Sequence, residues 1–361
     1  MTITLPLTYL VRLYFPRALH TGADVPGIGK ESSLPYLHSD TLYSALVNTW
    51  ADIGGDLEAL VPPKGKTSDS WEPALFISSA FPFAVNPDEQ SLDYYLPRPL
   101  LPPPNFRDPD PRSREWQERR YGKEVKELSF VRLRDFCKWI AGDAADPPAF
   151  PPAKTGQLLF RAQHTRDRLT EATGVYFIGE TATDNRGSGL YCLVRVRDEA
   201  LFSQASLKRL FEEVGRRGLG GRRSTGSGFY REEDCEIDDL QRSRGYWQQL
   251  LNIDQSAQGY VSLSLYNSPQ IKAKDCYAYR LAPRQGRMYS TQVYDQSRRK
   301  RVWMFAEGSV FYTRSTDDLS TPPGRLVDVT PDDFTVHKVY RYGYVFPVTI
   351  PSLPCRSSST D

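Results

Sequence analysis

Hydrophobic and polar residues alternate along the first stretch of the chain. The apolar positions there are Ile3, Leu5, Leu7, Tyr9, Val11 and Leu13. A period of two is typical of a β-strand that buries one of its faces. Further strand-like runs occupy residues 75–85, 128–133, 158–163, 175–178 and 190–196. The first part of the chain is therefore predicted to contain a sheet.

Two segments between these runs have the apolar spacing of a helix. In the first, Ser39 or Asp40 is a suitable N-cap, and the apolar positions that follow are Leu42, Ala45, Leu46 and Trp50. In the second, Gly218 is suited to end the helix, and the apolar positions are Leu207, Leu210, Phe211 and Val214. The resulting order, β-α-β-β-α-β, is the ferredoxin-like order.

The length of 361 residues favours two domains. We expect an N-terminal ferredoxin-like domain over residues 1–240, with an insertion at 87–152 that is rich in proline and charge. Proline is dense enough over 97–111 to disfavour regular structure, so the insertion is interpreted as carrying a mobile arm. Residues 257–350 contain further strand-like runs and suggest a degenerate copy of the first domain, and the tail 351–361 is predicted to be disordered.

The composition narrows the class of protein. The 46 Lys and Arg residues nearly balance the 44 Asp and Glu residues, so a protein that coats duplex DNA is disfavoured and any nucleic-acid contact should be local. The five cysteines include no CxxC pair, which predicts neither a disulfide framework nor a zinc site. No signal peptide and no apolar run of membrane-spanning length are evident, so a cytoplasmic location without membrane contact is expected.

The clearest candidate site is a glycine-rich loop that follows the second helix. Its glycines are Gly218, Gly220, Gly221, Gly226 and Gly228, and they surround Arg222, Arg223 and Ser224. Glycine permits close approach of a ligand, and arginine matches phosphate oxygens, so the loop is predicted to hold a phosphate chain. The order helix, loop, strand is opposite to that of dinucleotide-binding folds and P-loops, which disfavours a nucleotide cofactor. A flexible surface turn is the alternative.

Two other basic or polar regions are weaker candidates. His38 and Ser39 stand at a helix N-terminus, which attracts phosphate, and Lys30 lies in the preceding loop. The alternative is that Asp40 is only a helix cap and His38 only a structural histidine. Residues 160–170 contain a basic cluster that consists of Arg161, His164, Arg166 and Arg168, although an ordinary charged hairpin fits equally well. The basic run at 298–301 is interpreted as a solvated turn.

Catalysis has little support in the sequence. The four histidines, at positions 20, 38, 164 and 337, show no metal-binding spacing, and no nucleophile motif is present. No metal and no cofactor are therefore expected. A metal-independent ribonuclease needs only an acid and a base near the 2′-hydroxyl, and His20 or His38 with a tyrosine would supply them. Asp40 is a second candidate acid.

Three segments of the chain carry a resemblance to a known family. They are His38-Ser-Asp-Thr-Leu-Tyr-Ser-Ala-Leu46, then Tyr94-Tyr-Leu-Pro-Arg-Pro-Leu100 with Lys126-Glu-Leu-Ser-Phe-Val131, and the loop from Gly218 to Gly228. Together they resemble the RAMP superfamily of CRISPR RNA-binding proteins, and more closely the Cas five-like subunit of type III-A (Csm) effector complexes, the fourth Csm subunit. Nothing is carried over onto residues 102–118 or the tail.

The resemblance implies an α+β fold with tandem ferredoxin-like domains, antiparallel sheets and an RNA-binding loop after the second helix of the first domain. It implies a non-catalytic scaffold subunit that binds the 5′ tag of the CRISPR RNA (crRNA) and contacts the large polymerase-like subunit and a backbone subunit. It also implies that the basic cluster near residue 164 lies in a thumb-like hairpin that separates tag from guide bases. A RAMP-type endoribonuclease that processes the precursor RNA is the main alternative, and a protein scaffold that never touches RNA is another.

Overall fold

The first predicted strand lies inside a sheet of antiparallel strands. The computed structural model describes residues 6–22, 30–66, 71–86, 88–107, 110–143, 157–166, 173–183, 186–288, 297–314 and 319–354. The central strands of the sheet are β10 (Cys235–Asp239), β1 (Thr8–Leu13), β9 (Ser188–Val196) and β4 (Phe81–Asn86), in this order. Helices α1 (Ser39–Asp52) and α4 (Gln204–Arg217) pack against this sheet and against each other.

This strand order confirms the ferredoxin-like arrangement. The second strand of the motif is divided into β3 (Leu75–Ile77) and β4, and both parts pair with β9. The residues between them, Ser78 and Ser79, are fully buried and use their hydroxyls in hydrogen bonds. The predicted helices are also confirmed, because their apolar residues face the sheet.

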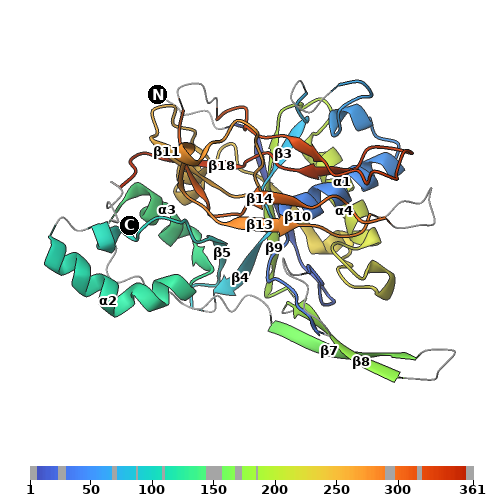
Figure 1. Cartoon of the computed structure of the whole chain (residues 1–361), viewed down its shortest axis with the longest axis horizontal. Helices are drawn as coiled ribbons and strands as arrows, with labels where there is room; N and C mark the ends of the chain where they lie inside the picture. Colours follow the sequence, from blue (N-terminus) through green and yellow to red (C-terminus); the bar gives the residue numbers. More distant parts are fainter. Residues whose placement is uncertain are drawn as a thin grey trace.

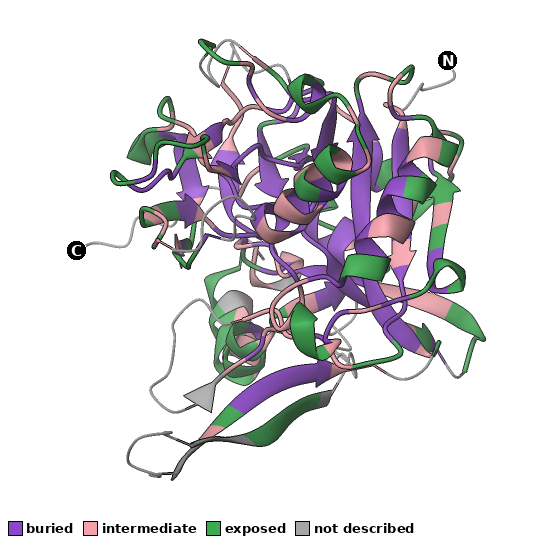
Figure 2. Cartoon of the chain, turned by 90° about the vertical axis from the view of Figure 1, so that its right-hand side faces the viewer, coloured by how far each residue is buried: buried purple, intermediate pink, exposed green. Residues whose placement is uncertain are grey.

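Burial of β1 differs from the prediction of a half-buried strand. Val11 and Leu13 face the two helices, as the alternation suggests. On the other face, Leu10 is also buried, in a cluster that includes Val261 and Val348 of the C-terminal half. The insertion and the second half of the chain together therefore cover the face of the sheet that the helices leave open. Figure 2 shows buried residues along the strands throughout the body of the molecule.

The inserted segment is packed where the structure describes it. Its elements are β5 (Ser91–Pro97), η3 (Pro104–Arg107), α2 (Pro111–Glu127), β6 (Phe130–Arg132) and α3 (Leu133–Ala141). Strands β5 and β6 extend the sheet beyond β4. Proline did not prevent α2, because Pro111 occupies the first turn and Asp110 accepts a hydrogen bond from the Arg112 amide. The described part of the insertion is thus a folded extension of the sheet rather than an arm.

A long hairpin leaves the body of the molecule (Figure 1). It consists of β7 (Gln157–Arg166) and β8 (Thr173–Ala182), which pair along their whole length. The short strand β2 (Lys30–Glu31) pairs with β8 in parallel. Leu158, Phe160 and Phe177 are exposed on one face of the hairpin.

The C-terminal half repeats the same strand order with little helix. Its sheet consists of β12 (Cys276–Ala278), β15 (Val310–Tyr312), β11 (Gly259–Ser262) and β18 (Pro347–Ile350), in this order. In order along the chain, these are the second, third, first and fourth strands, as in the first half. Two further hairpins are β13 (Leu281–Arg284) with β14 (Val302–Phe305) and β16 (Leu326–Asp328) with β17 (Tyr340–Tyr342).

Short helical elements complete the chain. They are η1 (Leu57–Ala59), η4 (Arg223–Thr225), η5 (Glu232–Asp234), α5 (Tyr246–Leu251) and η6 (Ala273–Asp275). In the part of the chain that the structure describes, none of the helices has the length and apolarity needed to cross a bilayer.

Candidate nucleic-acid interface

The glycine-rich loop begins where α4 ends. The Ser203 hydroxyl caps the start of this helix by accepting a hydrogen bond from the Ser206 amide (3.3 Å), and Gly218 follows its last residue with a φ of 78°. The loop itself contains the single turn η4 and rejoins the sheet through η5 and β10. The order helix, loop, strand is the one that the sequence predicts.

Packing of the chain against itself explains two of the glycines. A Cβ on Gly228 would lie 1.9 Å from the carbonyl oxygen of Leu219, and one on Gly220 would lie 2.5 Å from that of His20. Both residues also have positive φ, 69° and 84°, which a side chain would strain. These glycines therefore shape the loop, and their presence alone does not indicate a bound ligand.

Hydrogen bonds attach the loop to the segment that follows β1. The amides of Gly221 and Gly228 donate to the carbonyls of His20 (2.8 Å) and Ala18 (3.2 Å). The hydroxyl of Ser227 donates to Ala18 and accepts from the His20 amide, both at 3.0 Å. The amides of Gly221 and Gly228 are therefore engaged within the protein.

Three segments of the chain meet at this loop. The His20 ring bonds through Nδ1 to the carbonyl oxygen of Gly179 in β8 (2.7 Å), and Leu19 pairs with Thr181 of the same strand. The loop, the segment after β1 and the base of the hairpin are thereby held together.

Arginines surround this junction. Arg222 is half-buried, and Arg223 and the neighbouring Ser224 are exposed. Arg17 is exposed, and its Nη1 lies 2.5 Å from where a Cβ of Gly226 would be. Arg161 of β7 has a side chain 67% exposed and pairs with Glu180 at 3.3 Å. The sequence analysis did not identify Arg17 as part of this site. Its position between the first strand and His20 was the signal that could have indicated it.

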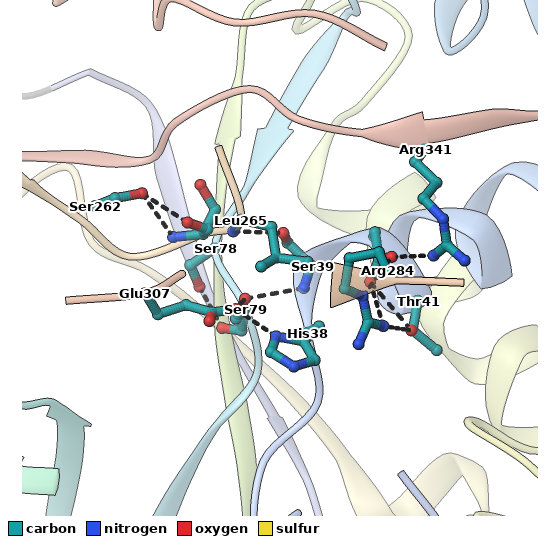
Figure 3. A network of polar contacts seen from close by, with 12 residues as sticks. His38, Ser39, Thr41, Ser78, Ser79, Ser262, Leu265, Arg284, Glu307 and Arg341 are labelled. Carbon is teal, nitrogen blue, oxygen red and sulfur yellow. Dashed lines mark hydrogen bonds and ion pairs between the residues drawn. The ribbon is translucent and has the colours of Figure 1, made fainter. Parts of the chain in front are cut away.

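The N-terminus of α1 is buried instead, and its residues belong to the network of polar contacts in Figure 3. His38 and Ser39 are 2% and 0% exposed, so the prediction that they contact RNA is not supported. The His38 ring bonds through Nδ1 to Glu307 (2.8 Å), which also accepts a hydrogen bond from the Ser79 hydroxyl. The Ser39 hydroxyl accepts from the Leu265 amide (3.0 Å). These bonds join α1 to the C-terminal half.

Asp40 is not a helix cap. His38 occupies the N-cap position, and the Asp40 carboxylate accepts from the guanidiniums of Arg284 (3.0 and 3.1 Å) and Arg341. Burial acts to raise the pKa of Asp40, but the two arginines outweigh it and hold that pKa well below its usual value. For Glu307, burial is likewise outweighed, chiefly by His38, and the net shift of the pKa is downward. Both carboxylates are therefore ionised inside the protein.

The remaining predicted residues are placed only in part. Lys30 lies in β2 and is paired with Phe177 of β8. His164 and Arg166 lie near the far end of β7. For these three residues the structure describes the backbone but not the side chain. Arg168 is outside the described residues altogether. Of the two candidate catalytic histidines, His20 lies at the loop and His38 is buried. Within the described ranges, no cluster of His, Cys, Asp or Glu is arranged to hold a metal.

Residues 255–350 match the family model of the CRISPR Csm4 C-terminal domain. This part of the chain is similar to a Csm4 C-terminal domain. It contains the sheet of β11, β12, β15 and β18, as well as Arg284, Glu307 and Arg341. The resemblance to Csm4-like RAMP subunits, which rested on segments before residue 230, is thus confirmed by an independent part of the chain.

Solved structures show that the fold extends over nearly the whole chain. A chain of the crystal structure of a Csm3-Csm4 subcomplex in the type III-A CRISPR-Cas interference complex is similar over 96% of this chain and 100% of its own length, with a TM-score of 0.59 and 14% identity. A chain of the Csm1-Csm4 cassette in complex with AMPPNP is similar over 97% and 99%, with a TM-score of 0.56 and 18% identity. These likenesses confirm the tandem ferredoxin-like fold. No curated protein matches the chain in sequence.

Proposed function

We propose that this chain is the Csm4-type subunit of a type III-A CRISPR interference complex, where it binds the 5′ tag of the crRNA and acts as a scaffold in antiviral defence. The observation that carries the proposal is the meeting of the glycine-rich loop, the segment after β1 and the base of the hairpin. Arg17, Arg161, Arg222 and Arg223 surround this junction, which is the charge that a short run of phosphates requires.

The hairpin supports a further part of the proposal. It reaches away from the junction and has exposed apolar side chains on one face, including the rings of Phe160 and Phe177. Rings on an extended hairpin are suited to insert beside an unstacked base. We infer that the hairpin separates the tag, held at the loop, from the guide bases beyond it.

The fold and the family match also support the proposed partners. The similar solved structures are of Csm1-Csm4 and Csm3-Csm4 assemblies. We infer that this chain contacts a large polymerase-like Csm1 subunit and a backbone Csm3 subunit. A non-catalytic role is supported by the dispersal of the histidines, since His38 is occupied by Glu307 in the interior.

The proposal is tested on RNA that co-purifies with the complex. Sequencing should find crRNA with one defined 5′ end that begins in the repeat, and cross-linking should attach that end to this chain. RNA with no defined 5′ end, or no contact between the tag and this chain, would contradict tag binding and favour a scaffold that never touches RNA.

A cleavage assay separates the proposal from the ribonuclease alternative. Labelled repeat RNA incubated with the purified chain, with or without Mg²⁺, should stay intact. Specific cleavage that His20→Ala abolishes would establish a RAMP-type endoribonuclease instead. His20 is the better probe because it lies at the surface junction, whereas a change at buried His38 would also disturb the fold.

A further inference from the structure

Strands β13 and β14 form a ribbon that continues the hairpin of β12 and β15 in the C-terminal half. Pro283 is opposite Trp303, and Ala282 is opposite Met304. Ala282 and Met304 point inward and pack with Leu265 in a small core cluster. Arg284, on the same side, reaches Asp40 of α1. The inner face of the ribbon is therefore fully used by the fold.

The outer face of the ribbon carries large rings in contact with solvent. Tyr279, Leu281 and Trp303 are 49%, 45% and 54% exposed, and Trp303 is the most exposed large hydrophobic side chain that the structure describes. Phe305 shares this face, with its ring edge-on to that of Tyr279 at 5.4 Å between centroids. In Figure 1 the ribbon crosses the side of the molecule that faces the viewer. We call the surface made by Tyr279, Leu281, Trp303 and Phe305 the ribbon face.

The charges around the ribbon face are positive. Arg301 is exposed and precedes Trp303 by two positions, so it projects on the same side of the ribbon, whereas Arg280, between Tyr279 and Leu281, projects on the other side. The guanidinium of Arg301 is held by Gln285, to which its Nε and Nη2 donate at 3.1 and 2.8 Å.

The described stretches that form the ribbon contain few carboxylates. Over the described residues 268–288 and 297–314, the only acidic residues are Asp275 and Glu307, and both are buried. Lys300 of the basic run is engaged elsewhere, by Asp332 at 2.6 Å. Within these described stretches, the exposed side chains beside the rings are neutral or cationic, which favours a polyanion over a basic protein partner.

We propose that the ribbon face is a second RNA-binding surface, on which unpaired bases of single-stranded RNA stack against Trp303 and Tyr279 while Arg301 contacts a phosphate. Exposed rings beside arginines are the arrangement by which proteins bind single strands, since every base has a face that stacks. Duplex RNA does not fit, because its bases are already stacked on one another. The surface belongs to a different half of the chain from the glycine-rich loop, and the inference does not depend on tag binding.

The spacing of the rings sets how many bases are held. Tyr279 and Trp303 lie about four residues apart along the ribbon, which corresponds to about 13 Å at the rise of a strand. One base cannot contact both rings over that distance. Each ring is therefore expected to take its own base, and a short oligonucleotide should bind more weakly when either ring is removed.

The test measures binding of a fluorescein-labelled ten-nucleotide oligouridylate to the full chain by anisotropy. It is run on the parent and on an Arg222→Ala, Arg223→Ala background, so that RNA held at the glycine-rich loop is not counted. Trp303→Ala should weaken binding roughly tenfold in both, given the usual contribution of stacking to each base. Trp303→Phe should retain most of the affinity, and Arg301→Ala should reduce the salt dependence.

The matched control is Trp116→Ala, because Trp116 of α2 is 52% exposed and also lies beside an arginine, Arg120. It should leave binding unchanged. Equal losses from Trp116→Ala and Trp303→Ala would overturn the proposal, as would unchanged binding in every ribbon variant. If Trp303→Ala spares RNA binding but prevents co-purification with another Csm subunit, the ribbon face is a protein interface and the proposal is wrong. If the glycine-rich loop does not bind RNA, the Arg222→Ala, Arg223→Ala background will bind the oligonucleotide as tightly as the parent does. That result is independent of the ribbon variants.

Discussion

The glycine-rich loop and the N-terminus of α1 look alike in sequence and differ in the structure. Both combine small polar residues with charged ones next to the end of a helix, and both suggest a phosphate site. The loop places Arg223 and Ser224 in solvent, whereas His38, Ser39 and Asp40 are buried. The difference is that the C-terminal half supplies partners for the second region, Arg284, Arg341 and Glu307. A polar helix terminus can therefore serve to join two domains as readily as to bind a ligand.

The largest loss of stability is expected when the buried ion pairs between α1 and the C-terminal half are broken. Asp40→Ala would leave Arg284 and Arg341 without their counter-ion in the interior, which typically costs about 3–5 kcal/mol. Urea unfolding of the full chain measures the loss. Asp52→Ala is the matched control, because Asp52 ends the same helix and also pairs with an arginine, Arg217, but at the surface. It should cost less than about 1 kcal/mol. Similar losses in the two variants would contradict the distinction between joint and surface.

A smaller loss of stability is expected inside the loop. Gly228→Ala would place a Cβ against the carbonyl of Leu219 at a positive φ, so we expect about 1–3 kcal/mol of destabilisation. Gly65→Ala is the control, since Gly65 also has a positive φ but no atom within 4 Å of its Cβ position. The midpoint of thermal unfolding should be clearly lower for Gly228→Ala than for Gly65→Ala. Equal midpoints for the two variants would contradict the close packing of the loop around Gly228.

Acid should weaken the joint between the halves. The pKa of Glu307 is lowered in the folded state, so this group stabilises the fold above the pKa of an unfolded glutamate, near 4.3, and the contribution is lost as pH falls further. Urea midpoints between pH 7 and pH 3 should therefore decline more steeply for the parent than for Glu307→Gln. Parallel curves would show that Glu307 is not held ionised.

The smallest effect on the fold is expected at Arg17. It is exposed beside Gly226, so Arg17→Ala should change stability by less than about 0.5 kcal/mol. It should nevertheless weaken binding of a tag oligonucleotide and lower the slope of log affinity against log salt by about one unit. An unchanged slope would remove Arg17 from the interface.

The parts of the fold that sequence patterns predicted are those with local signals. The helices α1 and α4 follow from apolar stripes, and the strand order follows from where those helices fall. The helices of the insertion were missed because proline was taken as decisive, although α3 has its own apolar stripe at Leu133, Phe136, Cys137 and Ile140. Attention to that spacing would have found it.

The partners of Asp40 had no local signal at all. Arg284 and Arg341 lie 244 and 301 residues further along the chain, and nothing near either of them indicates a buried ion pair. The same holds for the second covered face of β1, which depends on residues beyond 260. Contacts between the two halves decide whether a polar residue is inside or outside, and a pattern within one half does not contain that information.

The central claim is that the loop, and not the N-terminus of α1, contacts RNA. The most direct measurement is a salt titration of tag-RNA binding to Arg222→Ala, Arg223→Ala, compared with Arg242→Ala, Arg244→Ala. The second pair is exposed and follows β10, near the end of β1 opposite to Arg17. The loop variant should bind more weakly, with the salt slope lower by about one to two units, while the control should match the parent. Equal affinities and slopes for parent, loop variant and control would contradict the account.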